Sequence, residues 1–312
     1  MVRLKAMDGK LLLTLGARTL DSSLCYFWRE FEEAQMPKFV FTLLAVIMMV
    51  TSLNAQTDRD QNRDQGVRRI YSYDNMPPRQ LIDCPTAATL PRASFDFEMR
   101  TTSNGGLIAQ TGIGLHRKFM LGVSYGGEQI LGEGKATWQD NIAFQVKYQL
   151  ISETTVLPAI AIGYDGQGYG HYFSDLKRYM YKSKGFYAVA SKGYQTYQWS
   201  SGLHAGINYS LESDIDKDDD MTVFFGADLS LQNDISLVAE YDLALNDNRY
   251  DKANLNNVTM HSGKGWGYFN VGIRWIFSER LELGLDLENL FENRADVNSF
   301  TRGLRITYLE FF

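Results

Sequence analysis

Three places in this sequence combine residue types that could do chemistry. His204 has Ser200 and Ser210 on the same stretch of chain, so together with a carboxylate it could form a nucleophile, a base and an orienting group. The aspartate-rich run 214–220 could supply oxygen ligands to calcium. The run 163–170 is rich in glycine, as phosphate-binding loops are.

Each of these places has a simpler interpretation, which we prefer. His204 falls on the polar face of an expected strand, where a histidine joins a hydrogen-bond network. The run 214–220 lacks the glycine and the closing glutamate of an EF-hand, and a charge run at a loop tip is usually solvated. The run 163–170 lacks the lysine and the following helix of a nucleotide site. We therefore predict no enzyme, no catalytic residue, no metal and no cofactor.

The elements that would position these residues are β-strands. In 141–150 and 281–288, apolar side chains alternate with polar or small ones, which is the period-two pattern of a strand with one apolar face. Extending the count predicts twelve strands, at 93–102, 107–115, 119–126, 141–151, 156–164, 185–192, 198–211, 221–231, 235–245, 266–277, 281–290 and 302–312.

The connectors between these strands alternate in length, apart from one short hairpin at 103–106. Short connectors lie at one end of an up-and-down sheet and long ones at the other, as in outer-membrane barrels. The sequence therefore predicts an all-β fold, an up-and-down antiparallel transmembrane β-barrel of about twelve strands. A soluble two-sheet sandwich is the alternative, since it has the same alternation.

The polar faces carry charges of both signs, which we expect to line the lumen. A twelve-strand barrel is too wide for apolar side chains to fill, so the apolar face should contact lipid. The candidate lumen charges are Asp96, Glu98, Arg100, Lys147, Asp228, Glu240, Asp242, Arg274, Glu282, Asp286, Glu288 and Arg305.

The N-terminal third divides into three parts ahead of the barrel at 92–312. Lys38 and the apolar run 39–50, followed by small residues up to Ala55, predict a signal peptide over 36–55 that is too short to span a bilayer. Residues 1–35 resemble an upstream translation start rather than structure. Residues 56–91 are polar and punctuated by proline, which predicts a flexible periplasmic leader that docks on a partner or folds into the lumen.

Charge and cysteine content narrow the partners. The formal net charge of −6 and the lack of a basic patch argue against nucleic acid. Of the two cysteines, Cys25 falls in the segment 1–35 and Cys84 in the leader, so the mature chain has no intramolecular disulfide. The terminal strand, which ends in Phe312, resembles the signal that the barrel assembly machinery recognises, so we expect this machinery as a partner. We also expect contact with the lipid and lipopolysaccharide of the outer membrane of a Gram-negative-type bacterium.

Aromatic residues follow the glycine-rich run on a long loop. Tyr169, Tyr172, Tyr179 and Tyr181 could stack on sugar rings of a polysaccharide or reach lipopolysaccharide. The same side chains would also serve an ordered loop folded over the pore.

Three runs of sequence carry a family resemblance. The run Ser-Tyr-Gly-Gly at 124–127, the proline-initiated run 157–165, and the run 185–192 ending in Ser-Lys resemble the YjbH-type family of outer-membrane proteins, which is associated with exopolysaccharide biosynthesis. The resemblance extends in layout over most of 93–312. It implies a cell-envelope role and no catalytic residues.

Two functions follow as expectations. The first is a non-enzymatic outer-membrane barrel with a cell-envelope or exopolysaccharide-related role. The alternative is a passive, porin-like channel for small hydrophilic solutes, weakly cation-selective because acids outnumber bases among the lumen charges.

Overall fold

The computed structural model describes residues 3–7, 10–14, 76–174, 176–195, 199–231, 234–248, 263–278, 280–294 and 299–312. The chain divides into two compact units, Met1–Arg69 and Ile70–Phe312. The expected signal peptide over 36–55 lies outside the described residues, as do residues 56–75 of the expected leader.

The described part of the first unit is an antiparallel pair of strands, β1 (Arg3–Met7) and β2 (Lys10–Thr14). It belongs to the segment 1–35, for which the sequence predicts no structure. Asp8-Gly9, which separates the two strands in the sequence, is a dipeptide favoured in two-residue hairpin connections. This local signal accounts for the difference.

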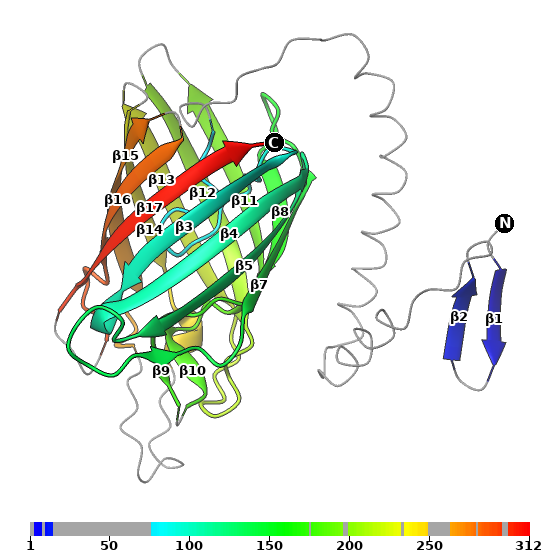
Figure 1. The fold of residues 1–312 in the computed structure, drawn as a ribbon. Helices are drawn as coiled ribbons and strands as arrows, with labels where there is room; N and C mark the ends of the chain where they lie inside the picture. The colour runs from blue at the N-terminus through cyan, green and yellow to red at the C-terminus, as the bar shows by residue number, and fades with distance from the viewer. Residues whose placement is uncertain are drawn as a thin grey trace. The chain divides into compact units, whose positions relative to one another are not determined.

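The second unit is a closed antiparallel β-barrel, and its fold confirms the predicted class (Figure 1). Among the described residues, twelve strands form the wall. They are β3 (Ser94–Thr102), β4 (Gly106–His116), β5 (Phe119–Glu128), β7 (Ala143–Ile151), β8 (Ala159–Asp165), β11 (Gly185–Gln195), β12 (Trp199–Ser210), β13 (Thr222–Leu231), β14 (Ile235–Asp242), β15 (Tyr268–Ser278), β16 (Leu281–Glu288) and β17 (Thr301–Phe311).

The barrel closes through the pairing of β17 with β3, which joins the last strand to the first. Each other strand pairs with its neighbours in chain order. The ends of the strands therefore alternate between two rims, a turn-side rim with short connectors and a loop-side rim with long ones. In Figure 1 the C-terminus lies at the turn-side rim and the long loops lie at the opposite one.

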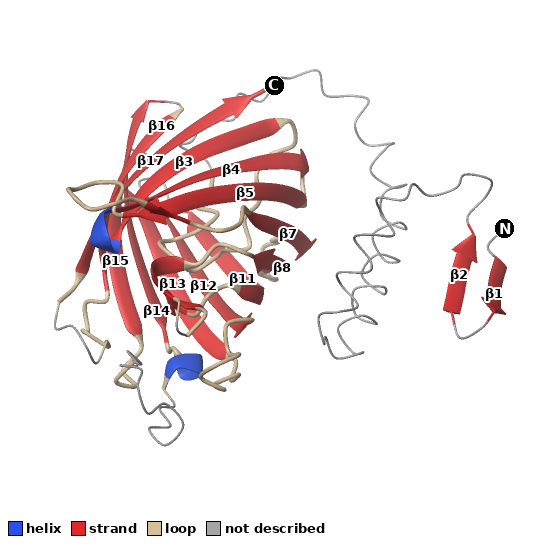
Figure 2. Cartoon of the chain, turned by 60° about the horizontal axis from the view of Figure 1, so that its bottom comes forward, coloured by secondary structure: helices blue, strands red, loops and turns tan. Residues whose placement is uncertain are grey.

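Three short elements belong to the loop-side rim and were not predicted. β6 (Thr137–Trp138) pairs with the end of β5, and β9 (Tyr169–Phe173) pairs with β10 (Arg178–Tyr181) as a separate two-stranded sheet. Two single-turn 3-10 helices, η3 (Ser103–Gly105) and η4 (Leu245–Asp247), lie in loops at the same rim (Figure 2). Within the described residues no helix is long and apolar enough to cross a membrane.

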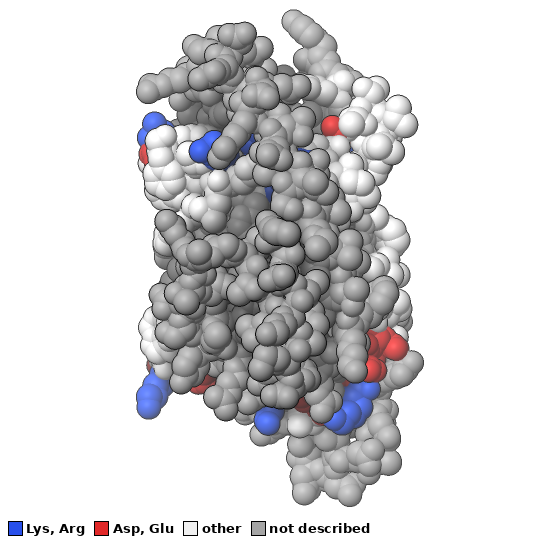
Figure 3. Space-filling view, turned by 90° about the vertical axis from the view of Figure 1, so that its right-hand side faces the viewer, with Lys and Arg blue, Asp and Glu red and all other residues white. Residues whose placement is uncertain are grey.

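The two faces of the wall differ in chemistry as the alternation predicts. Large apolar side chains on the outside are exposed, among them Phe97, Phe144, Leu203, Phe225, Ile273, Leu285 and Leu304. Charged side chains of the same strands are buried on the inside. Where the wall is visible in Figure 3 it is free of charge along most of its height, and Lys, Arg, Asp and Glu gather near the two ends.

Residues 76–91, which we call the plug, lie inside the barrel rather than forming a flexible leader. The segment folds back on itself as a tight turn: the Leu81 N–H donates to the Cys84 carbonyl, and Gln80 pairs with Pro85. Its apolar side chains Leu81, Ile82 and Leu90 are fully buried, which stabilises the segment inside the barrel. Of the two sequence-based alternatives for this stretch, the structure has the one in which it folds into the lumen.

Candidate functional site in the barrel interior

The turn of the plug is held by the carboxylate of Glu240, which projects inward from β14. Glu240 accepts hydrogen bonds from three successive backbone N–H groups, those of Ile82, Asp83 and Cys84, at 2.9 to 3.1 Å. Asn270 of β15 donates a further hydrogen bond to the same carboxylate at 2.8 Å. A carboxylate can only accept hydrogen bonds, so this run of N–H groups is a complementary partner for it.

Three arginines from neighbouring strands hold the carbonyls of the same turn. Arg100 of β3 and Arg305 of β17 both donate to the carbonyl of Ile82, at 3.1 and 2.8 Å. Arg274 of β15 donates to the carbonyl of Leu81 at 2.7 Å. Hydrogen bonds from a charged donor are stronger than neutral ones, so these contacts fix the turn firmly against the wall.

The arms of the plug are held in the same manner from β7 and β11. Lys147 donates to the carbonyls of Arg79 and Ala88, at 2.7 and 3.1 Å. The side-chain amide of Gln149 donates to the carbonyl of Ala87 at 3.1 Å, and Ser191 Oγ accepts the Ala87 N–H at 2.8 Å. All four of these contacts are to main-chain atoms of the plug.

Ser191, His204 and Asp228 form a chain of hydrogen bonds across β11, β12 and β13. The Ser191 Oγ lies 2.8 Å from His204 Nδ1, and His204 Nε2 lies 2.8 Å from Asp228 Oδ1. The residue types are those of a catalytic triad. The Oγ, however, lies on the N–H side of Ala87, where it accepts a hydrogen bond, so the chain anchors the plug.

The sequence points to Ser200 or Ser210 as the serine nearest His204, and that interpretation is wrong. Ser191 is the cross-strand partner of His204 in the pairing of β11 with β12. Residues two positions apart on one strand share a face, but directly opposite residues on neighbouring strands lie closer.

The same arginines also form ion pairs with carboxylates of the wall. Arg274 lies 2.5 Å from Asp286, and Arg305 lies 3.5 Å from both Glu98 and Asp286. Arg100 contacts Glu288 at 3.4 Å and also Asp83 of the plug at 2.6 Å. The plug adds another pair, between Arg79 and Asp96.

The candidate lumen charges all lie on inward-facing strand positions. Asp242 and Glu282 are half-buried, and the other ten are buried: Asp96, Glu98, Arg100, Lys147, Asp228, Glu240, Arg274, Asp286, Glu288 and Arg305. The structure thus brings the set together. It also shows what the sequence did not indicate, namely that six of these residues bond the backbone or a side chain of the plug directly: Asp96, Arg100, Lys147, Glu240, Arg274 and Arg305.

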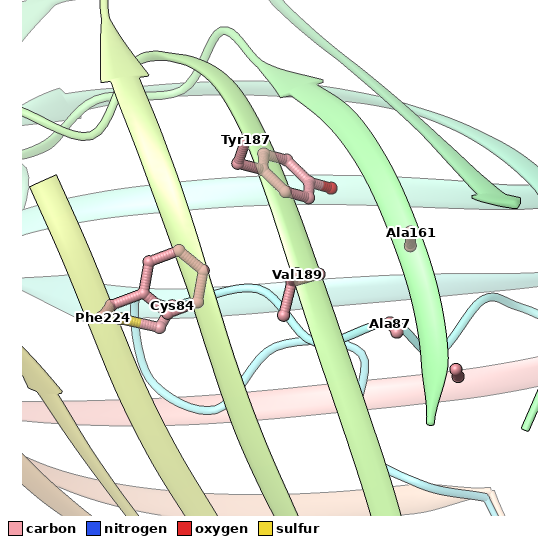
Figure 4. Packing of buried hydrophobic residues seen from close by; sticks show 7 residues of the cluster. Cys84, Ala87, Ala161, Tyr187, Val189 and Phe224 are labelled. Carbon is pink, nitrogen blue, oxygen red and sulfur yellow. The ribbon is translucent and has the colours of Figure 1, made fainter. Parts of the chain in front are cut away.

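Apolar contacts complete the seat of the plug. Cys84 lies beside Phe224 of β13, and Ala87 lies near Val189 of β11 (Figure 4). Leu81 and Ile82 pack with Val238 of β14. In the sequence, the buried position of the plug is indicated only by apolar residues such as Leu81, Ile82 and Leu90 in an otherwise polar stretch.

Glycines on the inner wall make room for the plug. A Cβ at Gly226 would collide with the Leu81 side chain, and one at Gly114 would collide with the Pro91 carbonyl. The space left by these two inner-wall glycines is thus filled by residues of the plug.

A cavity of about 660 Å³ remains beside the plug. Its lining includes Glu98, Lys147, His204 and Thr307 from the inner wall, and it also reaches Gln195 at the turn-side rim. A second cavity of about 40 Å³ lies beside Cys84 and Tyr169, toward the loop-side rim. The plug therefore separates a polar space open to the turn side from the loops.

The long loops cover the other end of the lumen. Tyr169 is buried: the Gln80 side chain donates to its hydroxyl at 3.0 Å, and the Arg100 guanidinium lies 4.6 Å from the centre of its ring. Tyr181 is also buried, whereas Tyr172 is exposed and Tyr179 is half-buried. Of the four candidate glycan-contacting tyrosines, Tyr169 and Tyr181 therefore pack inward like those of a loop folded over a pore.

Asp216 of the aspartate-rich run pairs with basic residues in or beside β10. Arg178 lies 3.2 Å from Asp216 and 2.8 Å from Asp247, and Lys182 lies 2.9 Å from Asp216. The ion pairs are buried. No group of metal-ligating side chains suited to an ion is present in the described part of the chain.

A buried carboxyl outside the membrane-spanning strands joins β9–β10 to the barrel. Glu212, in the loop after β12, accepts hydrogen bonds from the N–H groups of Tyr179 and Lys184, at 2.8 and 3.2 Å. Burial raises the pKa of Glu212 to about 7, because the charged form loses its hydration, and these hydrogen bonds oppose the shift only in part.

No family model matches the sequence, and no curated protein matches it. Solved structures with a similar fold include the KdgM porin, with 11% identity, a TM-score of 0.41, and coverage of 70% of this chain and 99% of that one. The outer membrane protein Omp33 of Acinetobacter baumannii is similar with 11% identity, a TM-score of 0.40, and coverage of 69% and 97%. The NanC porin follows with 10% identity, a TM-score of 0.38, and coverage of 70% and 98%. At these identities the likeness is one of fold alone.

Proposed function

We propose that this chain is a non-enzymatic outer-membrane channel for small hydrophilic solutes, and that the plug closes it in the state described here. The exposed apolar exterior supports a membrane location, because soluble proteins rarely expose apolar surface on this scale. The wall is built from strands whose outward side chains suit lipid and whose inward side chains suit water.

The observation that carries the proposal is the way in which the lumen is filled. The plug forms no ladder with any strand of the wall and is instead held by side chains. A segment held in this way can leave without breaking the barrel, and the cavity of about 660 Å³ beside it is already polar. Removal of the plug would extend this space toward the loop-side rim.

The wall charges favour cations in the open state. Acidic side chains outnumber basic ones on the inner wall, and the plug itself contributes one of each, Asp83 and Arg79. Rings of acidic side chains select for cations in channels. An exopolysaccharide-related role of the YjbH type stays a prediction from the family resemblance, and no contact described above bears on it.

Planar lipid bilayers test the proposal directly. The purified protein should show almost no current in buffer. Urea at a concentration that leaves the barrel intact should open it, because a segment outside the strand ladder can unfold locally before the whole barrel does. The reversal potential in a potassium chloride gradient should indicate weak cation preference, and washing out the urea should close the channel. Large steady current before urea, or none after plug release, would contradict the proposal.

A further inference from the structure

We propose that the barrel interior is a binding site for oligopeptides, and that the plug is an attached ligand of this site which another peptide can replace. The inference deepens the proposed function and rests on it in one respect, since the bound peptide is what closes the channel. The ligand is a short peptide with a tight turn, and it enters the barrel from the turn-side rim.

The wall contacts the plug largely through the backbone of the plug. Donors from the wall make six hydrogen bonds to five carbonyl groups of the turn and both arms, and acceptors from the wall meet four N–H groups. The carbonyls belong to Arg79, Leu81, Ile82, Ala87 and Ala88, with the Ile82 carbonyl shared by two arginines, and the N–H groups belong to Ile82, Asp83, Cys84 and Ala87. Backbone groups are common to every peptide, so these contacts do not depend on the side chains of the ligand.

Hydrogen-bond donors and acceptors are segregated on the wall. Arginine donates only and a carboxylate accepts only. The guanidinium groups of Arg274 and Arg305 therefore require carbonyls, while Glu240 requires N–H groups, within one turn of chain. A simple cation or anion satisfies one of these sets and repels the other. A peptide turn supplies both.

The pockets that hold the plug side chains set a limited preference for the sequence of the ligand. Leu81 and Ile82 are fully buried against Val238, and Leu90 is fully buried with Met120 and Leu309. Ala87 is fully buried in a place that suits a small residue. A replacing peptide should therefore have apolar residues beside its turn and a small residue a few positions later.

Both arms of the plug lead to the same rim. Pro91 leads directly into β3 at the turn-side rim, and Met76 and Pro77 line the cavity that reaches Gln195 there. A peptide in solution on that side could follow the same route without passing the loops.

The experiment converts the plug into a free ligand. A recognition site for a specific protease is inserted between Arg92 and Ala93, both exposed, and the folded protein is cut in detergent. A fluorescent synthetic peptide with the sequence of residues 76–92 is then added, and its anisotropy reports binding. We expect the labelled peptide to exchange with the cut plug and to bind saturably.

Matched peptides and barrels separate backbone recognition from mere packing. A peptide N-methylated at residues 83 and 84 loses two of the three N–H groups that donate to Glu240 and keeps only that of Ile82, so it should bind at least tenfold more weakly. A peptide that keeps Leu81, Ile82, Asp83, Ala87 and Leu90 but replaces its other residues should bind within tenfold of the native sequence. The cut Glu240→Gln barrel should lose at least tenfold in affinity, while cut Asp242→Asn, altered at a lumen carboxylate that does not bond the plug, should be unchanged.

A second measurement uses the uncut chain and so does not depend on the inserted site. Cys84 is buried at the turn, and an excess of peptide carrying Ser in its place should expel the plug and speed modification of Cys84 by a maleimide. Equal binding of the N-methylated peptide, binding by the native sequence alone, or unchanged Cys84 modification would overturn the inference. Current through the cut barrel tests the channel separately, since peptide binding without current would refute the channel and leave the site.

Discussion

The backbone N–H of Cys84 donates to Glu240 Oε2 at 2.9 Å in the centre of the barrel, between residues 156 positions apart in the sequence. The two groups belong to segments of opposite kind, a wall strand and the plug. This hydrogen bond therefore links the position of the plug, which closes the lumen, to the fold of the wall.

Glu240→Gln should loosen the plug. The change replaces a charged acceptor of three N–H groups by a neutral one, and hydrogen bonds to charged groups contribute about 1.5–3 kcal/mol each. We expect modification of Cys84 by a water-soluble maleimide to be at least about tenfold faster, equivalent to about 1.4 kcal/mol. Bilayer current should rise in parallel.

Asp242→Asn is the matched control, because Asp242 lies two positions along β14 but bonds Thr222 and the Ala244 N–H instead of the plug. Its Cys84 modification should stay near the wild-type rate. From the sequence alone, neutralising Glu240 and Asp242 together is expected only to reduce the preference of the channel for cations. If the two single variants behave alike, Glu240 does not hold the plug.

Gly226→Ala should displace the plug by a different route. The added methyl group would collide with the Leu81 side chain, so the plug must shift. Overpacking of this kind typically costs about 1–3 kcal/mol. Cys84 should again become more reactive, and the double variant Gly226→Ala with Leu81→Ala should recover part of the protection. Absence of any recovery would mean that the collision is not with Leu81.

Leu285→Arg should destabilise the barrel from its lipid face. Leu285 projects outward from β16 and is exposed, and a charged side chain facing hydrocarbon costs about 2–4 kcal/mol at mid-depth. Refolding titrations in lipid vesicles give the free energy of unfolding, with Leu285→Phe as an apolar control that should be close to wild type. Equal tolerance of both changes would show that this face does not contact lipid.

Gly284, on the opposite face of the same strand, is a less tolerant site than the sequence indicates. From the alternation, Gly284→Ser on the lumen face looks mild. A Cβ there would lie 3.0 Å from Arg274 Nη1 and 3.1 Å from Arg305 Cβ, so the arginines would have to move. The crowding at Gly284 comes from side chains of neighbouring strands, so the local sequence pattern cannot predict it.

The strands and their faces could be predicted because strand periodicity is local. Every second residue of 281–288 faces the same side regardless of what pairs with it, so alternation alone separates Leu285 from Asp286. Connector lengths then distinguished the two rims. The hairpin β9–β10 escaped prediction because its tyrosines and charges follow no period.

The candidate site could be predicted only in part, for a physical reason. The inward charges follow from alternation, but their partners follow from register, which places Ser191 opposite His204. The plug has no periodicity at all, and it is fixed by wall side chains from six strands. Nothing in the stretch from Arg79 to Pro91 alone identifies Glu240 as the acceptor for its turn.

Arg178→Met should open the loop-side rim while leaving the barrel intact. Arg178 is fully buried between Asp216 and Asp247, and removing one partner of a buried ion pair typically costs about 3–5 kcal/mol. Hydrogen exchange should speed up in β9 and β10 but not in the wall strands. Lys135→Met, at an exposed site in another loop, is the control and should change the exchange rate neither in β9 and β10 nor in the wall strands.

The same ion pairs predict the effect of removing metal. Asp216 is already paired with Arg178 and Lys182, so the aspartate-rich run does not need calcium to neutralise it. Hydrogen exchange in β9 and β10 should be the same with calcium and with a chelator. Protection that depends on calcium would revive the ion-binding interpretation of 214–220.

The packing of β9–β10 should weaken as pH rises. The pKa of Glu212 is about 7 in the folded loop against an ordinary value of 4.5, because burial disfavours the carboxylate. The folded loop therefore holds a proton that the opened loop releases. The stabilising contribution is complete below about pH 4.5 and is lost as pH rises through about 7.

Hydrogen exchange at the Tyr179 and Lys184 amides measures this directly, after correction for the intrinsic pH dependence of exchange. Protection should be greater at pH 5 than at pH 8 in the wild type. Tyr179 and Lys184 donate to different oxygens of Glu212, so Glu212→Gln keeps an acceptor for only one of the two N–H groups, but it cannot ionise. Its protection, although lower, should therefore be the same at both pH values. Because Glu212 lies in a loop while the wall strands are held by their own ladder, wall amides should not respond; if they do, or if the variant keeps the pH dependence, another group is responsible.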